Sequence, residues 1–461
     1  MFPGVLASQP GAAKLAGSSF LGKRRCLSVA SPSRSSRIRQ AARADSAPAV
    51  DASKKFDARA FRRSLNQTDR YVRNPWKDAD SIAEMERDGS GYSKTGLLAK
   101  MRENGNKWEE GKVSLILAEA MGYCWGVERA VQMAYEAVNA YPGKQLHLTN
   151  EIIHNPGVNQ KMSEKGYNFI DTNKDGEKDF SGVKEGDVVL LPAFGASVEE
   201  MRLLKDRNVQ IVDTTCPWVS KVWNAVDRQT KKNHTSIIHG KWSHEETVAT
   251  ASFASDYVIV RDIGEAEYVC DYILNGGDRE EFMKKFVNAH SAGFDPDTML
   301  ERVGLANQTT MLKGETEAIG KLLEKTVLKK YGPEGLKEHF MVMDTICDAT
   351  QERQDAMYEM TKDDAPKLDM ILVVGGFNSS NTSHLQEIGE LANITSYWID
   401  SPDRINIEER SITWQASNHD KTTTKDFLPE GNLVIGVTSG ASTPDRAVEL
   451  CLEKIFHMQN A

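Results

Sequence analysis

From residue 113 onward, short apolar runs rich in β-branched residues alternate with stretches of helical length and period. The apolar runs predict strands within 113–120, 187–194, 209–215, 235–240, 256–262, 340–346, 370–376, 394–400 and 432–438. The stretches between them predict helices over 126–140, 197–206, 217–231, 315–331, 348–361, 383–392 and 444–458. Strands that alternate with helices are typical of an α/β chain with parallel sheets.

Two segments depart from this alternation. Residues 45–110 are polar and charged, with apolar clusters around Phe61 and over 97–101, and we interpret them as an extension that wraps the rest of the chain. Residues 271–300 are richer in charge and glycine, which predicts an insertion or an irregular lid. A chain of 461 residues is too long for one ordinary core, so we expect roughly two to four domains.

The most informative internal repeat contains cysteine. The segments VQIVDTTCPWVSKVWNAV and FMVMDTICDATQERQDAM share the order apolar strand, Asp-Thr-x-Cys, helix, and VSLILAEAMGYCWGVERAVQMA has the same order without the Asp-Thr pair. Cys124, Cys216 and Cys347 therefore each follow the carboxyl end of a strand and begin a helix. Their spacings of 92 and 131 residues predict one cysteine for each α/β unit. Open α/β sheets bind ligands at this edge.

Three cysteines in this position favour a metal centre. The first turn of a helix presents unpaired N–H groups and a partial positive charge, which stabilise the thiolate that ligates metal. Three such thiolates could hold zinc or an iron–sulfur cluster, and a 4Fe–4S cluster with three cysteines instead of four leaves one iron open to substrate. Spacing alone favours three unrelated buried thiols, because no compact ligand motif is present. The repeated position and the polar motifs below reverse this preference.

Two predicted strands end in small polar loops that suit an anion. In LVVGGFNSSNTSHLQE the strand leads to Ser379, Ser380 and Asn381, and Ser383 is predicted to cap the following helix. In LVIGVTSGASTPDRAVEL the strand leads to Ser442 just before a helix. Each loop offers hydroxyl groups, backbone N–H groups and a helix start, which together suit a phosphate. A serine-rich turn is most often only a turn, so the prediction rests on two such loops in one chain.

Two histidines and a glutamate complete the polar set. His154 follows the apolar pair in NEIIHNPGV, and His244 and Glu246 begin a predicted helix in GKWSHEETVA. We predict that both histidines donate hydrogen bonds to phosphate and that Glu246 is a proton source. Two alternatives stay open at this point. Glu246 could serve only as a cap, because Ser243 and Glu246 match the capping-box pattern, and the histidines could be structural.

Composition separates the first 44 residues from the rest. They contain eight Lys or Arg and eight Ser, no Asp or Glu, and no apolar run of about seven residues. This pattern is typical of an organellar transit peptide and not of a secretory signal, with a disordered basic tail as the alternative. Its removal would change the net charge from −9 to −17, so nucleic acid is not an expected partner. No stretch approaches about eighteen consecutive apolar residues, and no membrane span is expected.

The ordered motifs resemble the 4-hydroxy-3-methylbut-2-enyl diphosphate reductase family in its plant and cyanobacterial form. The resemblance spans about residues 113–456. It rests, in order, on GYCWGVERAV, IIHNPGV, DTTCPWVSKV, SHEETVAT, ANQTT, DTICDATQERQ, FNSSNTSHL and TSGASTP. No single motif is specific, but the ordered set is.

The resemblance implies both a fold and a site. The fold is three small parallel-sheet α/β units in a pseudo-threefold trefoil around a central 4Fe–4S cluster, with Cys124, Cys216 and Cys347 as the ligands. The expected divisions are 1–44 as transit peptide, 45–111 as N-terminal extension, 112–216 as unit 1, 217–346 as unit 2 with an insertion near 271–300, and 347–461 as unit 3.

The resemblance also assigns the polar residues. The implied diphosphate contacts are His154, His244, Ser379, Ser380, Asn381 and Ser442. Thr309 in ANQTT matches the threonine that lies beside the substrate hydroxyl and Glu246. Phe194 in PAFGAS departs from the family pattern, because many bacterial members have histidine there. A polar diphosphate contact is therefore in doubt at this position.

The implied activity is the reductive dehydration of 4-hydroxy-3-methylbut-2-enyl diphosphate to isopentenyl and dimethylallyl diphosphates, the last step of the methylerythritol phosphate route to isoprenoids. Ferredoxin is the expected electron donor in a plastid stroma, although the sequence locates no basic patch for it. Whether the chain forms a homodimer stays open. Two other functions also stay open: a non-redox iron–sulfur hydro-lyase, and a non-catalytic cluster- or zinc-binding sensor.

Overall fold

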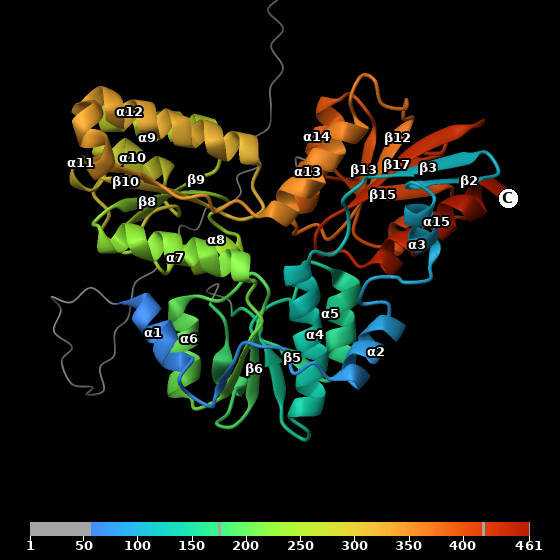
Figure 1. Ribbon diagram of the computed structural model, residues 1–461, viewed down its shortest axis with the longest axis horizontal. Helices are drawn as coiled ribbons and strands as arrows, with labels where there is room; N and C mark the ends of the chain where they lie inside the picture. The colour runs from blue at the N-terminus through green and yellow to red at the C-terminus, as the bar shows by residue number, and fades with distance from the viewer. Residues whose placement is uncertain (1–56, 174–176, 417–419, 461) are drawn as a thin grey trace, which may run out of the picture. The chain divides into compact units, whose positions relative to one another are not determined.

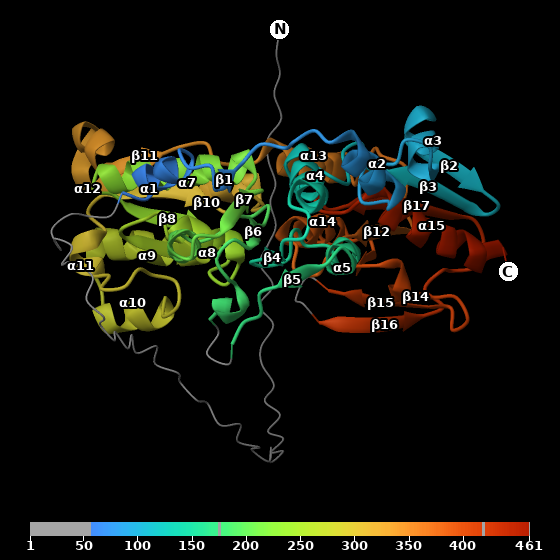
Figure 2. The same ribbon diagram turned by 90° about the horizontal axis from the view of Figure 1, so that it is seen from below.

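The structure is a computed structural model that describes residues 57–173, 177–416 and 420–460. The predicted transit peptide, residues 1–44, lies outside these ranges. The described residues form three β-sheets, each covered by helices (Figures 1 and 2). The predicted fold class, an α/β chain with parallel-sheet units, is confirmed.

The first sheet has its strands in the order β1–β7–β6–β4–β5, all of them parallel. Its strands are β1 (Tyr71–Val72), β4 (Leu146–Leu148), β5 (Tyr167–Phe169), β6 (Val188–Leu191) and β7 (Gln210–Asp213), and its helices are α4 (Trp125–Ala140), α5 (Pro156–Glu164) and α6 (Val198–Asp206), with the 3₁₀ turn η1 (Phe180–Gly182). Alternate residues of β6 pack on opposite sides, Val188 and Leu190 with α4 and α5, Val189 and Leu191 with α6. Burial on both faces explains the unbroken apolar run.

The second sheet has the order β11–β10–β8–β9, also all parallel. Its strands are β8 (Thr235–His239), β9 (Tyr257–Val260), β10 (Val303–Asn307) and β11 (Phe340–Val342). Its helices are α7 (Pro217–Lys231), α8 (Glu245–Ala251), α9 (Ile263–Asn275), α10 (Arg279–Lys285), α11 (Pro296–Met299) and α12 (Lys313–His339). The helix predicted over 315–331 ends where Gly332 takes a φ of 74° and interrupts α12.

The segment 271–300 is not an irregular lid. It forms the end of α9, then α10 and α11, and it places Phe282, Phe286 and Phe294 in the core of the second unit. Each of these rings is at most 2% exposed, and burial of one phenylalanine contributes about 1.5–3 kcal/mol. The segment is therefore part of the folded unit.

The third sheet has the order β14–β15–β13–β12–β17–β3–β2, with β16 paired to β15. Its strands are β2 (Lys107–Glu110), β3 (Val113–Leu117), β12 (Met370–Val374), β13 (Ser396–Ile399), β14 (Ile405–Asn406), β15 (Ser411–Gln415), β16 (Lys421–Lys425) and β17 (Leu433–Ser439). The four central strands are parallel, and the edge strands are antiparallel. Its helices are α3 (Leu97–Glu103), α13 (Asp348–Met360), α14 (Ser380–Leu391) and α15 (Asp445–Asn460), with the turn η2 (Pro402–Arg404).

From β3 onward, the described chain passes from one sheet to the next at three places. It leaves the third sheet after β3 and enters α4 on the first sheet. It leaves the first sheet after β7 and enters α7, which packs on β8 and β10 of the second sheet. It leaves the second sheet after β11 and enters α13 on the third sheet. The expected start of unit 1 at residue 112 differs from this path, because β3 pairs in parallel with β17 of the third sheet. Sequence periodicity could not identify a partner strand more than 300 residues away.

The described part of the N-terminal extension contacts all three units. It adds β1 to the first sheet and β2 to the third, and α2 (Ala79–Arg87) packs on α4. Its first helix is α1 (Ala58–Leu65), which lies beside α7. Figure 2 shows α1, α2 and α3 on the same side of the molecule as α7, α4 and α13. In the described ranges, none of the helices combines the length and the apolar character that a membrane crossing requires.

Candidate active site

One cavity is lined by every site residue selected from the sequence. Its walls come from the N-terminal ends of α4, α7, α8, α13 and α14, from the loop before α5, and from the loops after β10 and β17. The structure therefore brings eleven residues from all three units to one place: Cys124, Cys216, Cys347, His154, His244, Glu246, Thr309, Ser379, Ser380, Asn381 and Ser442.

Cys124, Cys216 and Cys347 are the N-cap residues of α4, α7 and α13. These are the three places where, from β3 onward, the chain passes from one sheet to the next. Each sulfur therefore stands at a junction between units, and the junctions meet at the cavity. The shared position inferred from the repeat explains this convergence, because every helix start faces the same centre.

The first turn of α4 is adapted to the sulfur atoms. A Cβ atom placed on Gly126 would lie 2.4 Å from Sγ of Cys216 and 3.9 Å from Sγ of Cys124. A contact under 3.0 Å forces a shift, so a residue larger than glycine at this position would displace the sulfur of Cys216. Both cysteines are free thiols.

The electrostatics of the thiols fit a bound metal centre. The pKa of Cys216 is raised to about 12, first by burial and then by Cys124 and Cys347, against the opposing backbone N–H groups of Trp218 and Val219. Three thiolates in this cavity therefore require a compensating positive charge. A metal centre with sulfur ligands supplies that charge, so the donor set fits either zinc or an iron–sulfur cluster.

Glu246 is buried and its carboxylate is held by one residue. Its Oε1 accepts a hydrogen bond from the backbone N–H of Thr309 at 2.6 Å, and its Oε2 accepts one from the Thr309 hydroxyl at 3.0 Å. The pKa of Glu246 is nevertheless raised to about 7, because burial outweighs these two bonds. The capping-box alternative with Ser243 is wrong, since His244 caps α8 and the carboxylate is used elsewhere.

The two histidines contact one another and Phe194. The rings of His154 and Phe194 stack with centroids 4.8 Å apart, and the rings of His154 and His244 meet edge to face at 5.2 Å. Phe194 therefore fixes the plane of His154 by packing. Its side chain has no hydrogen-bonding atom, so it offers the diphosphate no polar contact.

Hydrogen bonds assign different roles to the two rings. Nδ1 of His244 accepts the N–H of Glu246 at 3.2 Å, which leaves the ring proton on Nε2. Burial, and then His154 and Lys241, lower the pKa of His244 well below its usual range. Glu151 lies 3.2 Å from Nδ1 of His154 and can only accept, so that nitrogen carries a proton. Nε2 of His154 is buried and has no partner among the described residues.

Ligand atoms of His154, His244 and Glu245 lie within 4.8 Å of one another, a spacing that would suit a metal ion. However, the cap on α8 makes Nε2 of His244 a donor, and a metal ligand would need a lone pair there. The pair of rings therefore suits an anion better than a cation.

The two serine loops also line the cavity. Ser379 caps α14, and the helix begins at Ser380, three residues before the predicted cap Ser383, whose hydroxyl instead donates to Glu387 within the helix. The early start places the first N–H groups of α14 at the cavity, where they favour an anion.

Asn381 and Ser442 join these loops. Oδ1 of Asn381 accepts the N–H of Ala441 at 2.9 Å, while its Nδ2 is buried with no partner among the described residues. The hydroxyl of Ser442 donates to the carbonyl oxygen of His154 at 3.4 Å. Nδ2 of Asn381 is thus left as a donor for a ligand.

Gln308 was not predicted from the sequence, but its side chain connects α8 to the start of α14. Its Oε1 accepts from Thr247 at 3.0 Å, and its Nε2 donates to Thr310 at 2.8 Å and to Ser380 at 3.1 Å. It lies in the quoted motif ANQTT, but its role depends on partners on other elements. Glu151 was also missed, although its position three residues before His154 was a usable signal.

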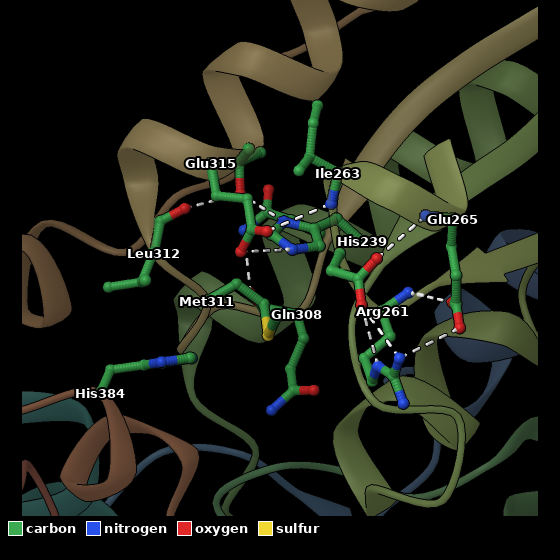
Figure 3. Close-up of polar contacts among 12 residues, drawn as sticks. His239, Arg261, Ile263, Glu265, Gln308, Met311, Leu312, Glu315 and His384 are labelled. Carbon is green, nitrogen blue, oxygen red and sulfur yellow. Dashed lines mark hydrogen bonds and ion pairs between the residues drawn. The ribbon is translucent and has the colours of Figure 1, made fainter. Parts of the chain in front are cut away.

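A network of buried hydrogen bonds holds the backbone of Gln308 in place. The backbone N–H of Gln308 donates to the carbonyl oxygen of His239 at 2.8 Å. Nδ1 of His239 lies 2.7 Å from the Thr316 hydroxyl and its Nε2 lies 3.5 Å from Glu315, which also accepts the N–H of Ile263 (Figure 3). These bonds fix the ends of β8 and β10, which precede Glu246 and Thr309.

The chain is similar to proteins of one family. The family model described as "LytB protein" matches residues 115–456. A relative from Botryococcus braunii, named 4-hydroxy-3-methylbut-2-enyl diphosphate reductase, chloroplastic, is 62% identical over 90% of this chain and 84% of its own. A relative of the same enzyme name from a Synechococcus strain is 56% identical over 88% of this chain and 100% of its own.

A solved structure shares the fold. The E-1-hydroxy-2-methyl-but-2-enyl-4-diphosphate reductase from Plasmodium falciparum superposes with a TM-score of 0.55 and 22% identity, over 75% of this chain and 88% of that one. The matched family model covers most of the chain, and the two relatives extend the match to nearly all of it. The chain therefore belongs to the LytB protein family.

Proposed function

We propose that this chain catalyses the reductive dehydration of 4-hydroxy-3-methylbut-2-enyl diphosphate to isopentenyl and dimethylallyl diphosphates, the last step of the methylerythritol phosphate pathway. The carbon–oxygen bond of the allylic hydroxyl breaks, a carbon–hydrogen bond forms, and two electrons and two protons enter as water leaves. The observation that carries the proposal is the placement of Glu246 and three cysteines in one cavity. The shared name of the close relatives supports it.

The three cysteines would hold one 4Fe–4S cluster, the cofactor type of this family. When bound, such a cluster supplies single electrons and an iron that can act as a Lewis acid. Cys124, Cys216 and Cys347 provide three sulfurs from three helix starts, and Gly126 keeps the space beside two of them clear.

The diphosphate would bind against the histidine pair and the serine loops. Nε2 of His244, Nδ2 of Asn381 and the first N–H groups of α14 are donors at the cavity. Nε2 of His154 can donate only when both ring nitrogens carry a proton, in which case Nδ1 donates to Glu151. Ser379, Ser380 and Ser442 add hydroxyl groups. This set suits an anion with several oxygens.

Glu246 would hold the proton that the departing hydroxyl needs. Because its pKa is about 7, a large fraction of the carboxyl is protonated at neutral pH. Thr309, hydrogen-bonded to both carboxylate oxygens, orients it and lines the same cavity. A protonated carboxyl beside a hydroxyl-bearing threonine can pass a proton without water from the bulk solvent.

We also propose ferredoxin as electron donor and a plastid stroma as location. The name "chloroplastic" of the Botryococcus braunii relative and the composition of residues 1–44 support the location. The donor follows from the location, and its docking surface is not assigned.

The proposal is tested with protein purified without oxygen. We expect iron and sulfide in the intact mature chain, and product formation only when a low-potential electron donor is added. Turnover without reductant would instead identify a hydro-lyase. Glu246→Gln should abolish product while keeping the cluster spectrum, whereas Glu267→Gln, at an exposed position of α9 away from the cavity, should keep both. Loss of the spectrum in Glu246→Gln would indicate a structural role, and a chain with cluster but no turnover would be a sensor.

A further inference from the structure

A buried carboxylate stands at the end of β7 and collects charged partners. Asp213 is 0% exposed. Its Oδ2 accepts hydrogen bonds from the hydroxyl of Tyr71 and from Nη2 of Arg62 at 3.2 Å, and it lies 3.1 Å from Nε of Arg73. Its Oδ1 accepts the N–H of Thr215 at 2.9 Å. We call Arg62, Tyr71, Arg73 and Asp213 the Asp213 cluster.

Three of the four members belong to the N-terminal extension. Arg62 is in α1, Tyr71 is in β1, and Arg73 follows β1 directly. The parallel pairing of β1 with β7 brings Tyr71 opposite Ile211, two residues before Asp213. Burial alone would raise the pKa of Asp213, but Arg62 and Arg73 outweigh it and lower the pKa to about 2. The carboxylate is therefore stable in this place only because the extension provides positive charge.

The cluster holds both sides of Cys216. Asp213 lies three residues before this cysteine, and Ser220 lies four residues after it in the first turn of α7. Arg62 donates to the Ser220 hydroxyl at 2.9 Å and Arg73 donates to it at 3.3 Å. The same two guanidinium groups thus link the end of the strand to the start of the helix, across the cysteine between them.

A second link reaches the helix of Cys124. Nη1 of Arg129, in α4, donates to the carbonyl oxygens of Thr214 at 3.2 Å and Thr215 at 3.4 Å. Nη2 of Arg129 donates to the carbonyl oxygen of Arg73 in the extension. The extension, the turn before Cys216 and the helix that Cys124 caps are therefore joined by buried, charge-assisted bonds.

We propose that Arg62, Tyr71 and Arg73 are positioning residues that act through Asp213 to set the place of the Cys216 sulfur. The extension would then be a support for the metal centre and not only a cover over the fold. This inference rests on the proposed function, because it takes Cys216 as a cluster ligand. Partners that orient metal ligands typically contribute about tenfold to a hundredfold in metal affinity.

Tyr71→Phe tests the proposal because it removes one hydroxyl from the cluster and little volume. Tyr167→Phe is the matched control: Tyr167 lies in β5, the opposite edge strand of the same sheet, is 4% exposed, and donates its hydroxyl to the carbonyl oxygen of Ala134 at 2.6 Å. Without oxygen, one measures the rate at which the holoprotein releases iron to a ferrous chelator, together with the melting temperature of the apoprotein.

We expect Tyr71→Phe to release iron at least about tenfold faster than wild type, and Tyr167→Phe to release it at the wild-type rate. Asp213→Asn should accelerate release further, because it leaves both guanidinium groups without their carboxylate. Both tyrosine variants should lower the apoprotein melting temperature by similar amounts.

Two results would overturn the proposal while leaving the function intact: a wild-type rate of iron release in Tyr71→Phe, or an equal acceleration in Tyr167→Phe. If Asp213→Asn does not fold, Tyr71→Phe decides alone. Wild-type protein without iron would instead overturn the proposed function itself.

Discussion

Glu246 combines two opposing influences on one carboxyl group. The two hydrogen bonds from Thr309 favour the ionised form, and burial at 2% exposure favours the neutral form. Burial is the larger influence, so the pKa is about 7 instead of 4.5. A proton donor with a pKa near the working pH is suited to a step in which water leaves.

We predict that kcat falls as the pH rises through about 7, because the protonated carboxyl is the active form. The measurement is kcat at saturating substrate between about pH 5.5 and 8.5, which separates this titration from that of the binding residues. A kcat that stays constant or rises across this range would contradict the role of Glu246.

The raised pKa of Glu246 also makes the stability of the folded protein depend on pH. The folded state binds a proton more tightly than the unfolded chain, so wild type should lose stability as the pH rises from 4.5 to about 7. Glu246→Gln should not show this part of the loss.

Glu151 provides the second prediction at this scale. Its carboxylate is 3.2 Å from Nδ1 of His154 and is 35% exposed, so its effect is moderated by solvent. Glu151→Gln should raise KM for the diphosphate substrate about threefold to tenfold and change kcat little, since Nδ1 of His154 loses the carboxylate that orients its ring. Glu164→Gln, at the exposed end of α5, is the control and should leave KM unchanged. Equal KM values in both variants would remove Glu151 from the site.

Among the elements, seven helices of the main body were predicted with their starts within a few residues, because each carries an amphipathic period and begins at recognisable residues, whereas α9, α10 and α11 were not predicted. The cap residues of α8 and α14 were not predicted correctly, since the actual caps His244 and Ser379 compete with serines that fit a capping pattern equally well. The strands β4 and β5 were missed because three residues are too few to show alternation. The gathering of site residues at helix starts could be predicted, whereas Gln308 could not, because its partners lie on three separate segments.

The close contact beside Gly126, in the first turn of α4, predicts the effect of adding one methyl group at this position. Gly126→Ala should fold but retain much less iron, because the new Cβ would stand 2.4 Å from Sγ of Cys216. Gly314→Ala is the matched control in the first turn of α12, where a Cβ meets nothing within 4 Å. It should keep full iron and gain about 0.5–1 kcal/mol of stability. Iron content and chemical denaturation test both, and full iron in Gly126→Ala would contradict the sulfur arrangement.

For the whole molecule, the path of the chain explains why three distant cysteines share one site. From β3 onward, each passage between sheets ends at a helix start, each of these helix starts carries a cysteine, and the pairing of β3 with β17 joins the first and last parts of the body. The strand–Cys–helix repeat indicated the local position of each cysteine. The closing pair could not be predicted, because the strand pattern of β3 fits either the first or the third sheet.

This arrangement predicts a specific effect of metal removal. A centre bound by Cys124, Cys216 and Cys347 would link three units that otherwise meet mainly through side chains, and binding to the folded state alone stabilises that state. Removal of iron by a chelator without oxygen should therefore lower the melting temperature and broaden the transition, since the units lose a shared constraint.

Cys451→Ser is the control, because Cys451 is buried in the third unit, away from the cavity, and bonds the carbonyl oxygen of Ala447. It should shift the holo and apo forms equally, whereas Cys347→Ser should melt like apoprotein with or without iron. Calorimetry distinguishes these outcomes, and identical holo and apo curves for wild type would mean that the sulfurs do not join the units.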